Sequence, residues 1–96
     1  MRIIARKRLR EYAARHADCG GALDAWYQVA RAASWKSFAD VRRDHPHADL
    51  VGNRTVFNIK GNSYRLITAI HYNGGRVYIR EILTHAEYDR GDWKER

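Results

Sequence analysis

The chain has 96 residues, with 18 Lys and Arg against 11 Asp and Glu, and its formal net charge is +7 at pH 7. This length predicts one domain over residues 1–96, and the excess of positive charge points to a polyanionic partner. The one cysteine excludes an intramolecular disulfide and a cysteine-based zinc site. No apolar run approaches the roughly 20 residues that cross a bilayer, and the N-terminus lacks a secretory leader pattern. We therefore expect a soluble, cytoplasmic protein without membrane contact.

The first half of the chain is predicted to be helical after a short edge strand at residues 2–5. Over residues 6–17, apolar side chains recur at the three- and four-residue spacing of one helix face. The glycine pair at 20–21 is expected to end this helix, and a second apolar stripe predicts another helix at about residues 22–33. A short third helix should end at Arg43.

The cap of that third helix is expected to be Ser34 or Ser37, because a hydroxyl accepts well from the first free amides of a helix. The one proline, Pro46, then marks a turn between the two halves. His45 and His47 flank this proline. We interpret them as residues of a solvated loop rather than metal ligands, and the sequence predicts no metal site and no cofactor.

The second half of the chain changes to the two-residue period of strands. We expect strands over 54–60, 64–72 and 76–83, joined by short Gly- and Asn-containing turns that favour hairpins. Thr84 and Glu87 form the pattern of a capping box that opens a last helical turn at 85–90. The predicted fold class is therefore α+β in two layers, with N-terminal helices packed on an antiparallel sheet and a short C-terminal helix.

Strand alternation predicts which side chains share a face of this sheet. The side expected to face the helices carries Tyr64, Leu66, Thr68 and Ile70 of the middle strand and Val77, Ile79 and Leu83 of the last. The opposite face then carries Lys60, Arg65, His71 and Arg80, with Asn58 and Tyr78 beside them. Converging cations suit a phosphodiester backbone. The alternative is that an antiparallel sheet simply solvates one face with charges.

His85 stands at the start of the last predicted helix, three residues before Tyr88 and four before Asp89. These spacings place all three on one side of the helix, near the Arg80 end of the sheet. Imidazole and phenol are suited to proton transfer. A helix cap with a packed tyrosine is the structural alternative.

Two segments resemble the HigB toxin family of the RelE-like superfamily. The first is Phe57-Asn58-Ile59-Lys60-Gly61-Asn62-Ser63-Tyr64-Arg65. The second is Arg80-Glu81-Ile82-Leu83-Thr84-His85-Ala86-Glu87-Tyr88-Asp89. The opening Met1-Arg2-Ile3-Ile4 and the Ala25-Trp26 helix are similar to the family as well, so the resemblance covers nearly the whole chain.

The resemblance implies a RelE-like fold and the toxin role in a type II toxin–antitoxin system. It implies a ribosome-dependent mRNA endonuclease (mRNA interferase) that inhibits translation and is neutralised by a HigA-like helix-turn-helix antitoxin. Operator DNA would be bound only through the toxin–antitoxin complex. The implied chemistry is metal-independent attack of a ribose 2′-hydroxyl on the adjacent phosphate, with no cofactor.

The resemblance also implies roles for individual residues. Lys60, Arg65 and Arg80 would surround the phosphate, and His85 and Tyr88 would transfer protons. Further RNA contacts are expected from Asn58, His71 and Tyr78, and the basic helix surface of Arg6, Lys7, Arg10 and Arg15 would hold ribosomal RNA or dock the antitoxin. Two alternatives stay open, a non-catalytic RNA- or DNA-binding protein and a co-repressor that acts with its antitoxin.

Overall fold

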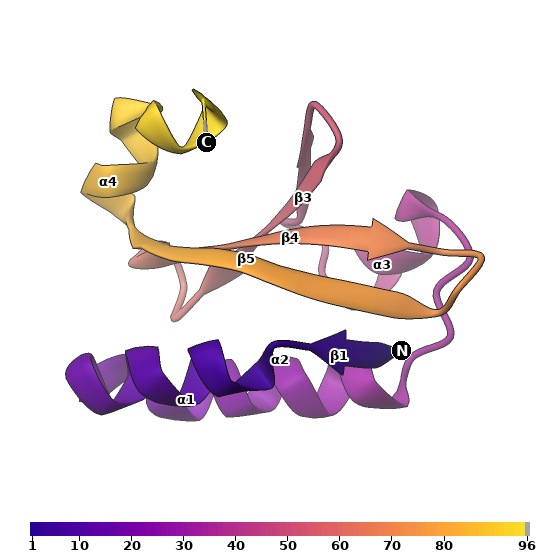
Figure 1. The fold of residues 1–96 in the computed structure, drawn as a ribbon, viewed down its shortest axis with the longest axis horizontal. Helices are drawn as coiled ribbons and strands as arrows, with labels where there is room; N and C mark the ends of the chain where they lie inside the picture. The colour runs from indigo at the N-terminus through magenta and orange to yellow at the C-terminus, as the bar shows by residue number, and fades with distance from the viewer. Residues whose placement is uncertain (96) are drawn as a thin grey trace.

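A computed structural model, which describes residues 1–95, contains a five-stranded sheet with two helices on one face and a short C-terminal helix on the other (Figure 1). The elements are β1 (Arg2–Ile4), α1 (Arg6–Arg15), α2 (Gly20–Ala32), α3 (Phe38–Asp44), β2 (Asp49–Val51), β3 (Arg54–Ile59), β4 (Tyr64–His71), β5 (Arg76–Thr84) and α4 (His85–Arg90). Short 3-10 turns follow α1 and α4, at Ala17–Cys19 and Asp92–Glu95. No helix within this described part is long and apolar enough to span a bilayer.

The two N-terminal helices bury the apolar stripes that predicted them. Leu9 and Tyr12 of α1 and Trp26 of α2 are buried against the sheet. The expectation for the glycine pair is wrong, because α1 already ends at Arg15 and Gly20 opens α2. A Cβ on Gly20 would lie 3.7 Å from that of Ala13, an ordinary van der Waals contact, so the packing of the two helices does not itself require glycine there.

The predicted caps of the two shorter helices are confirmed in part or in full. Ser37, rather than Ser34, caps α3 by accepting from the Asp40 amide at 3.4 Å. In α4 the capping box is complete, since Thr84 and Glu87 each accept a hydrogen bond from the other's backbone amide. The complete box fixes where His85 begins its helix.

The sheet order is β1-β5-β4-β3-β2, and strands β2 to β5 form an antiparallel meander. The predicted edge strand β1 pairs with β5 in parallel, which makes the sheet mixed rather than wholly antiparallel. Parallel pairing needs a long crossover connection, and the N-terminal helices form part of the chain between these two strands. The three-residue strand β2 was not predicted.

A bulge in β5 changes which residues face the helices. Ile67 pairs with Glu81 and Thr68 pairs with Ile79, so Arg80 is the extra residue. An extra residue reverses the alternation beyond it. The prediction for Leu83 is therefore wrong: it packs on the outer face, while Ile82 packs toward the helices.

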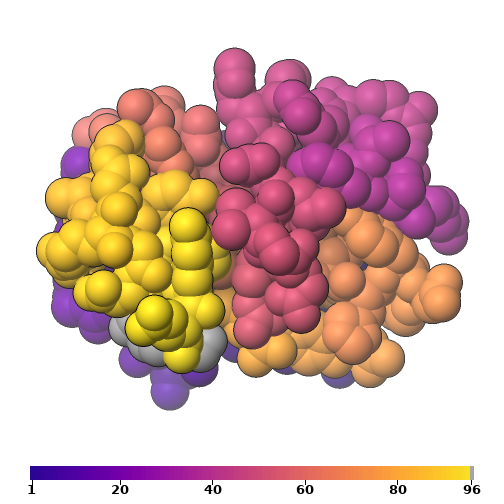
Figure 2. All heavy atoms as spheres, turned by 90° about the horizontal axis from the view of Figure 1, so that it is seen from above, coloured from indigo at the N-terminus to yellow at the C-terminus, as the bar shows by residue number. Residues whose placement is uncertain are grey.

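The sheet consequently separates two apolar clusters. The larger lies between the sheet and the helices and includes Phe57, Leu66 and Val77. The smaller lies on the outer face, where Val56, Ile67, Leu83 and Trp93 pack together. Viewed from that side, the C-terminal segment lies beside the β2–β3 segment (Figure 2). The C-terminal segment thus covers part of the outer face of the sheet.

Candidate functional site

The first group of predicted site residues lies where β4 meets α4, and we call Arg65, His85, Tyr88 and Asp89 the α4 cluster. The Arg65 side chain lies on the outer face of the sheet, and the residue is only 9% exposed. Its Nη1 donates to the carbonyl oxygens of Asn62 and Tyr64, both at 3.2 Å, and its Nη2 donates to Asn62 Oδ1 at 2.5 Å. The Cζ lies 5.4 Å from the centre of the Tyr88 ring. Arg65 is therefore a fixed and largely desolvated cation.

The positions of His85 and Tyr88 are set by the start of α4 at His85. The Nδ1 of His85 lies 2.9 Å from Asp89 Oδ2, one helical turn along. An imidazole that donates from Nδ1 has Nε2 as its proton acceptor. The backbone amide of His85 also donates to the Ser63 carbonyl at 3.0 Å, which ties α4 to the turn that precedes Arg65. The spacing thus places His85 and Asp89 in contact on one side of α4, and the cation that lies beside Tyr88 is Arg65, whereas Arg80 was expected there.

Tyr88 is half-buried, and its ring stacks on Trp93 with 5.2 Å between the ring centres. Burial raises the pKa of the Tyr88 hydroxyl, the charge of Asp49 raises it further, and Arg65 opposes the shift. A phenol with a raised pKa stays protonated at neutral pH. Tyr88 therefore carries its proton at neutral pH, and the same shift makes it a weaker acid than a free phenol.

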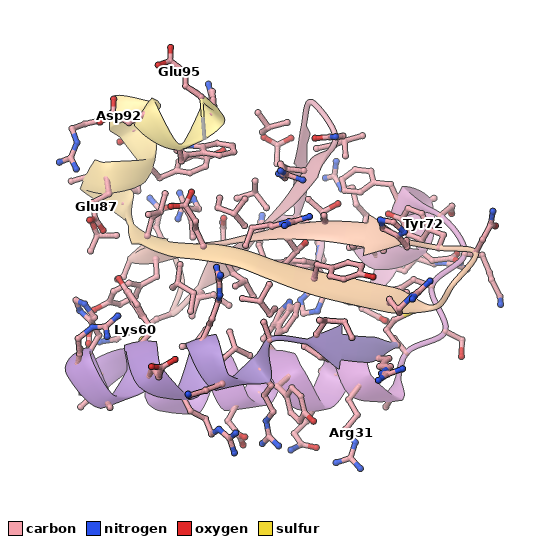
Figure 3. The ribbon with its side chains drawn as sticks, viewed as in Figure 1. Arg31, Lys60, Tyr72, Glu87, Asp92 and Glu95 are labelled. Atoms are coloured by element: carbon pink, nitrogen blue, oxygen red, sulfur yellow. The ribbon has the colours of Figure 1, made fainter. Side chains whose placement is uncertain are left out.

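The predicted position of Lys60 on the outer face is wrong. Lys60 follows β3 with a positive φ of 53°, outside the alternation of the strand, and its Nζ lies 2.9 Å from Asp18 Oδ2. The Tyr64 hydroxyl donates to Asp18 Oδ1 at 2.8 Å. We call Asp18, Lys60 and Tyr64 the Asp18 cluster, and it lies on the helix side of the sheet (Figure 3).

The two hydrogen bonds to Asp18 act on its titration and on that of Tyr64. Hydrogen bonds from Lys60 and then from Tyr64 lower the pKa of the Asp18 carboxyl. The hydrogen bond from Tyr64 to Asp18 and, to a smaller extent, burial raise the pKa of Tyr64 to about 12. The positive charge of Lys60 is therefore already matched by a carboxylate.

The other predicted outer-face residues form a second group along β5. The Arg80 Cζ lies 5.8 Å from the Tyr78 ring centre, and the His71 and Tyr78 rings lie 5.1 Å apart. His71 stands six residues beyond Arg65 on β4, which is about 20 Å along a strand. Asn58 is exposed and pairs with Arg65 in the β3–β4 register. Asn58 thus lies with the α4 cluster, whereas His71 and Tyr78 lie at the far end of the sheet.

The basic residues predicted on α1 are not equally free. The Arg6 Cζ stacks 3.9 Å from the centre of the Tyr27 ring, so Arg6 helps to join α1 to α2. Lys7 and Arg10 are exposed. Arg15 is exposed as well, but it also lines a cavity between α1 and β5.

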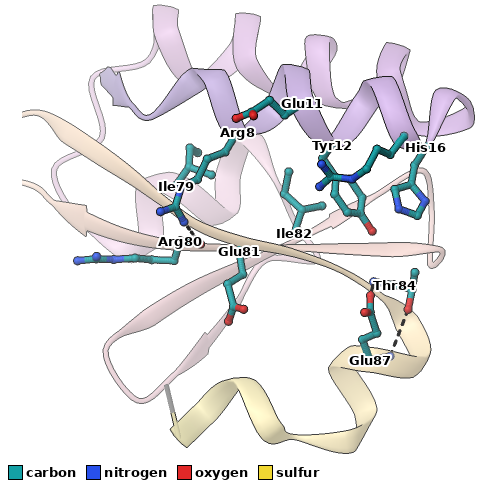
Figure 4. A pocket seen from close by; sticks show the side chains of 11 residues that line it. Arg8, Glu11, Tyr12, His16, Ile79, Arg80, Glu81, Ile82, Thr84 and Glu87 are labelled. Carbon is teal, nitrogen blue, oxygen red and sulfur yellow. Dashed lines mark hydrogen bonds between the residues drawn. The ribbon is translucent and has the colours of Figure 1, made fainter.

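That cavity has a volume of about 530 Å³ and brings together groups that the predictions did not include (Figure 4). Arg8 enters it from α1 and donates to the Arg80 carbonyl at 2.6 Å. The hydroxyl of Tyr12 is buried and finds no hydrogen-bond partner among residues 1–95, and burial raises its pKa to about 12. The helical spacing of Arg8, Tyr12 and Arg15 carried a signal for this shared face.

Asn62 is a second residue whose role was missed. It accepts from the Arg65 guanidinium with both its side-chain and backbone oxygens. The sequence placed it in a hairpin turn, where asparagine is common for conformational reasons, so composition alone could not reveal this contact. His45 also differs from its prediction, because its ring packs edge-on to Phe57 with 5.0 Å between the ring centres and burial lowers its pKa.

Metal-ligating side chains do not gather anywhere in residues 1–95: no group of three or more His, Cys, Asp or Glu is placed to hold a metal ion. Arginine, imidazole and phenol are the chemical groups of the α4 cluster. They can bind an oxyanion and exchange protons with it.

Comparison with known proteins identifies the family of this chain. Residues 19–91 match the family model of HigB_toxin, described as the RelE-like toxic component of a toxin–antitoxin system. A relative named mRNA interferase HigB, from Escherichia coli O6:H1, is 28% identical over 93 residues, which cover 94% of this chain and 90% of the relative. The mRNA interferase toxin HigB of Escherichia coli K12 is 44% identical over 34 residues, which cover 35% of this chain and 33% of that relative. The chain belongs to the HigB toxin family, the RelE-like toxic components of toxin–antitoxin systems.

Proposed function

We propose that this protein is an endoribonuclease that cleaves messenger RNA at the α4 cluster and so inhibits translation. Membership of a toxin family supports the biological role, and the name mRNA interferase of two relatives supports the reaction. The observation that carries the proposal is the Arg65 guanidinium, held by Asn62 and placed 5.4 Å from the Tyr88 ring, with His85 on the same helix as Tyr88.

The reaction that these groups suit is an internal transesterification. His85 Nε2 takes the proton of a ribose 2′-hydroxyl, and O2′ attacks the adjacent phosphorus. The bond between phosphorus and O5′ breaks, Tyr88 gives a proton to O5′, and the products are a 2′,3′-cyclic phosphate and a 5′-hydroxyl. Asp89 holds the imidazole through Nδ1, which leaves Nε2 as the proton acceptor.

Arg65 has the role of charge stabilisation in this scheme. Negative charge grows on the phosphoryl oxygens as the 2′-oxygen attacks, and a preorganised donor in a desolvated site stabilises it. This is the task that a metal ion performs in other nucleases, and we therefore propose a metal-independent mechanism. Arg80 and Lys60 stay candidates for phosphate contacts, and Lys60 would have to leave Asp18 to make one.

The proposal includes the setting in which the reaction occurs. In the α4 cluster, His85 and Asp89 reach the surface, while Arg65 lies beneath it. We propose that the ribosome presents the mRNA in the cytoplasm. We further propose that a HigA-like helix-turn-helix antitoxin neutralises the toxin, as the family resemblance implies.

The test is to map the ends of mRNA after incubation with translating ribosomes and purified protein. We expect new 5′-hydroxyl ends, and 2′,3′-cyclic phosphates on the upstream fragments. Arg65→Ala should lower the cleavage rate by about 10²–10³, the usual effect of removing one preorganised donor to an oxyanion.

Two controls make this result decisive. An mRNA with one 2′-deoxynucleotide at the cleaved position should resist cleavage there. Unchanged circular dichroism of Arg65→Ala should show that the fold is intact. Cleavage of the deoxy substrate, or products with 5′-phosphates, would overturn the transesterification mechanism, and wild-type cleavage by Arg65→Ala would place the site elsewhere.

A further inference from the structure

A second cavity, of about 580 Å³, lies at the end of the molecule opposite to α4. It is formed by the start of β1, the end of α2, the loop at residues 33–36 and the β4–β5 turn. Arg31 and Tyr72 both lie at this end (Figure 3). Its charged side chains are Arg2, Arg31 and Lys36, and no carboxylate is among the lining residues.

A fourth cation belongs to the same place. Arg76 is the register partner of Arg2 across the parallel strand pair, and its guanidinium folds back over Gly74, which lines the cavity. A Cβ on Gly74 would lie only 2.9 Å from the Nε of Arg76. Like charges on paired strand positions repel each other, so the fold brings these arginines together against their electrostatic preference.

The cations at this end lack local counter-charges. The ion pairs found within residues 1–95 are Arg43–Asp40, Lys60–Asp18, His85–Asp89 and Arg90–Asp92. Asp40, near in sequence to Lys36, already accepts from the Lys36 backbone amide and pairs with Arg43. The four exposed cations therefore have no carboxylate partner within the described residues, and an external anion can approach them.

Aromatic rings and amides accompany the charges. Tyr72 and Asn73 line the cavity, and the half-buried Tyr72 also packs against the core on the helix side of the sheet. The paired rings of His71 and Tyr78 lie on the outer face and are not among the lining residues. Cations that follow a phosphate backbone next to a ring that stacks on a base are a combination that binds single-stranded nucleic acid. An acidic protein segment would use the charges alone.

We propose that this cavity binds the phosphodiester backbone of single-stranded RNA, as a second RNA site separate from the α4 cluster. Arg2, Arg31, Lys36 and Arg76 contact phosphates, and the Tyr72 ring faces a base. His71, beside this site, is about 20 Å from Arg65 along β4. Binding here uses none of the groups assigned to proton transfer or phosphoryl charge, so the site goes beyond the proposed function and can be tested without cleavage.

The test measures binding of a fluorescent 2′-O-methyl RNA oligonucleotide, which lacks the attacking hydroxyl, as a function of salt concentration. The double variant Arg31→Gln/Lys36→Gln should bind more weakly. Its slope of log affinity against log salt should fall by about 1.4, because two phosphate contacts to a single strand are lost. A second arm measures binding to vacant small ribosomal subunits: a loss there identifies ribosomal RNA as the source, and a loss only with the oligonucleotide identifies the mRNA.

The matched control is Arg90→Gln/Lys94→Gln, which removes the same charge from exposed side chains at the C-terminal end. We expect the control to change the slope much less. Equal losses in both double variants would mean diffuse charge attraction and would overturn the proposal. So would a cavity variant that binds RNA normally but no longer binds polyglutamate.

Arg31 stands in the last turn of α2, where a cation also favours the helix dipole. Two further variants separate this effect from RNA binding. Arg2→Gln, outside any helix, should lower the slope by about 0.7, and Arg31→Lys should restore both charge and binding. Wild-type binding by Arg2→Gln and by the cavity double variant would overturn the site.

Discussion

The two sides of the β3–β4 turn use positive charge in opposite ways. On the helix side, the ammonium of Lys60 meets the carboxylate of Asp18, which also accepts from Tyr64. On the outer side, the partners of the Arg65 guanidinium within residues 1–95 are the carbonyl oxygens of its own turn and strand, one amide oxygen, and the Tyr88 ring. Four residues lie between Lys60, which pairs with a carboxylate, and Arg65, for which the described residues provide none.

The difference shows what each arrangement is suited to do. An exposed ion pair adds little to stability but holds the turn in one place. A largely buried cation without a carboxylate is costly, because its lost hydration is only partly replaced. Such a cation is ready to meet an anion. We therefore interpret the Asp18 cluster as a support for the β3–β4 turn, and the α4 cluster as the functional site that this turn positions.

The largest expected effects test the proton-transfer groups of the α4 cluster. His85→Ala and Tyr88→Phe should each lower the rate of mRNA cleavage on the ribosome by about 10²–10⁴, the usual contribution of a positioned acid or base. Tyr88→Phe keeps the ring against Arg65 and Trp93 and removes only the hydroxyl. The rates should come from single-turnover measurements on folded protein.

Asn58→Ala, on the neighbouring strand, is the matched control for this prediction. Asn58 is exposed and is the register partner of Arg65 on the neighbouring strand, so its substitution should weaken RNA binding more than it slows cleavage. Cleavage by His85→Ala and Tyr88→Phe at the wild-type rate would leave α4 without a chemical role.

A smaller effect is expected from the Asp18 cluster. If Lys60 only holds the turn, Lys60→Gln and Asp18→Asn should lower the cleavage rate by similar, modest factors. The double variant should then be no slower than either single one, because the two residues act as a unit. A large loss with Lys60→Gln alone, and none with Asp18→Asn, would instead assign Lys60 to the phosphate.

Most of the fold could be predicted from periodicity and turn chemistry. The apolar stripes located the N-terminal helices, Asn73-Gly74-Gly75 located the β4–β5 turn, and the capping box fixed the start of α4 at His85. The same box made the spacing from His85 to Tyr88 a reliable guide to a shared helix side. Each of these signals depends on residues that are close together in the chain, so a single sequence is enough to detect it.

The errors came from features that local patterns do not encode. The bulge at Arg80 depends on how β5 fits against β4, and it moved Leu83 to the outer face. Lys60 escaped strand alternation because its backbone has a positive φ, which is uncommon outside glycine. The parallel pairing of β1 joins it to β5, which is far away in the sequence, so no local pattern predicts it.

The site was predicted in part for the same reason. His85, Tyr88 and Asp89 are neighbours on one helix, and their grouping followed from spacing. Arg65 was placed on the correct face by alternation, but its contact with Asn62 needed the conformation of the turn. The cavity that Arg8 and Arg15 line joins α1 to β5, which are distant in sequence, and no local pattern joins them.

The smallest expected effect concerns stability in acid and separates the two clusters without any RNA. Hydrogen bonds from Lys60 and Tyr64 lower the pKa of Asp18 below its ordinary value of 3.8. The folded state therefore holds the ionised carboxyl more strongly than the unfolded state does. This contribution is present above about pH 3.8 and is lost as the pH falls through the folded-state pKa.

Asp18→Asn should accordingly make the decline in the free energy of unfolding below that pH shallower, with Tyr64→Phe intermediate. Arg65→Ala should leave the decline unchanged, because Arg65 stays charged and pairs with no carboxylate within the described residues. Urea unfolding followed by tryptophan fluorescence at a series of acidic pH values measures all four proteins. Identical declines for the wild type and Asp18→Asn, or a shallower one for Arg65→Ala, would show that the division between a matched and an unmatched cation is wrong.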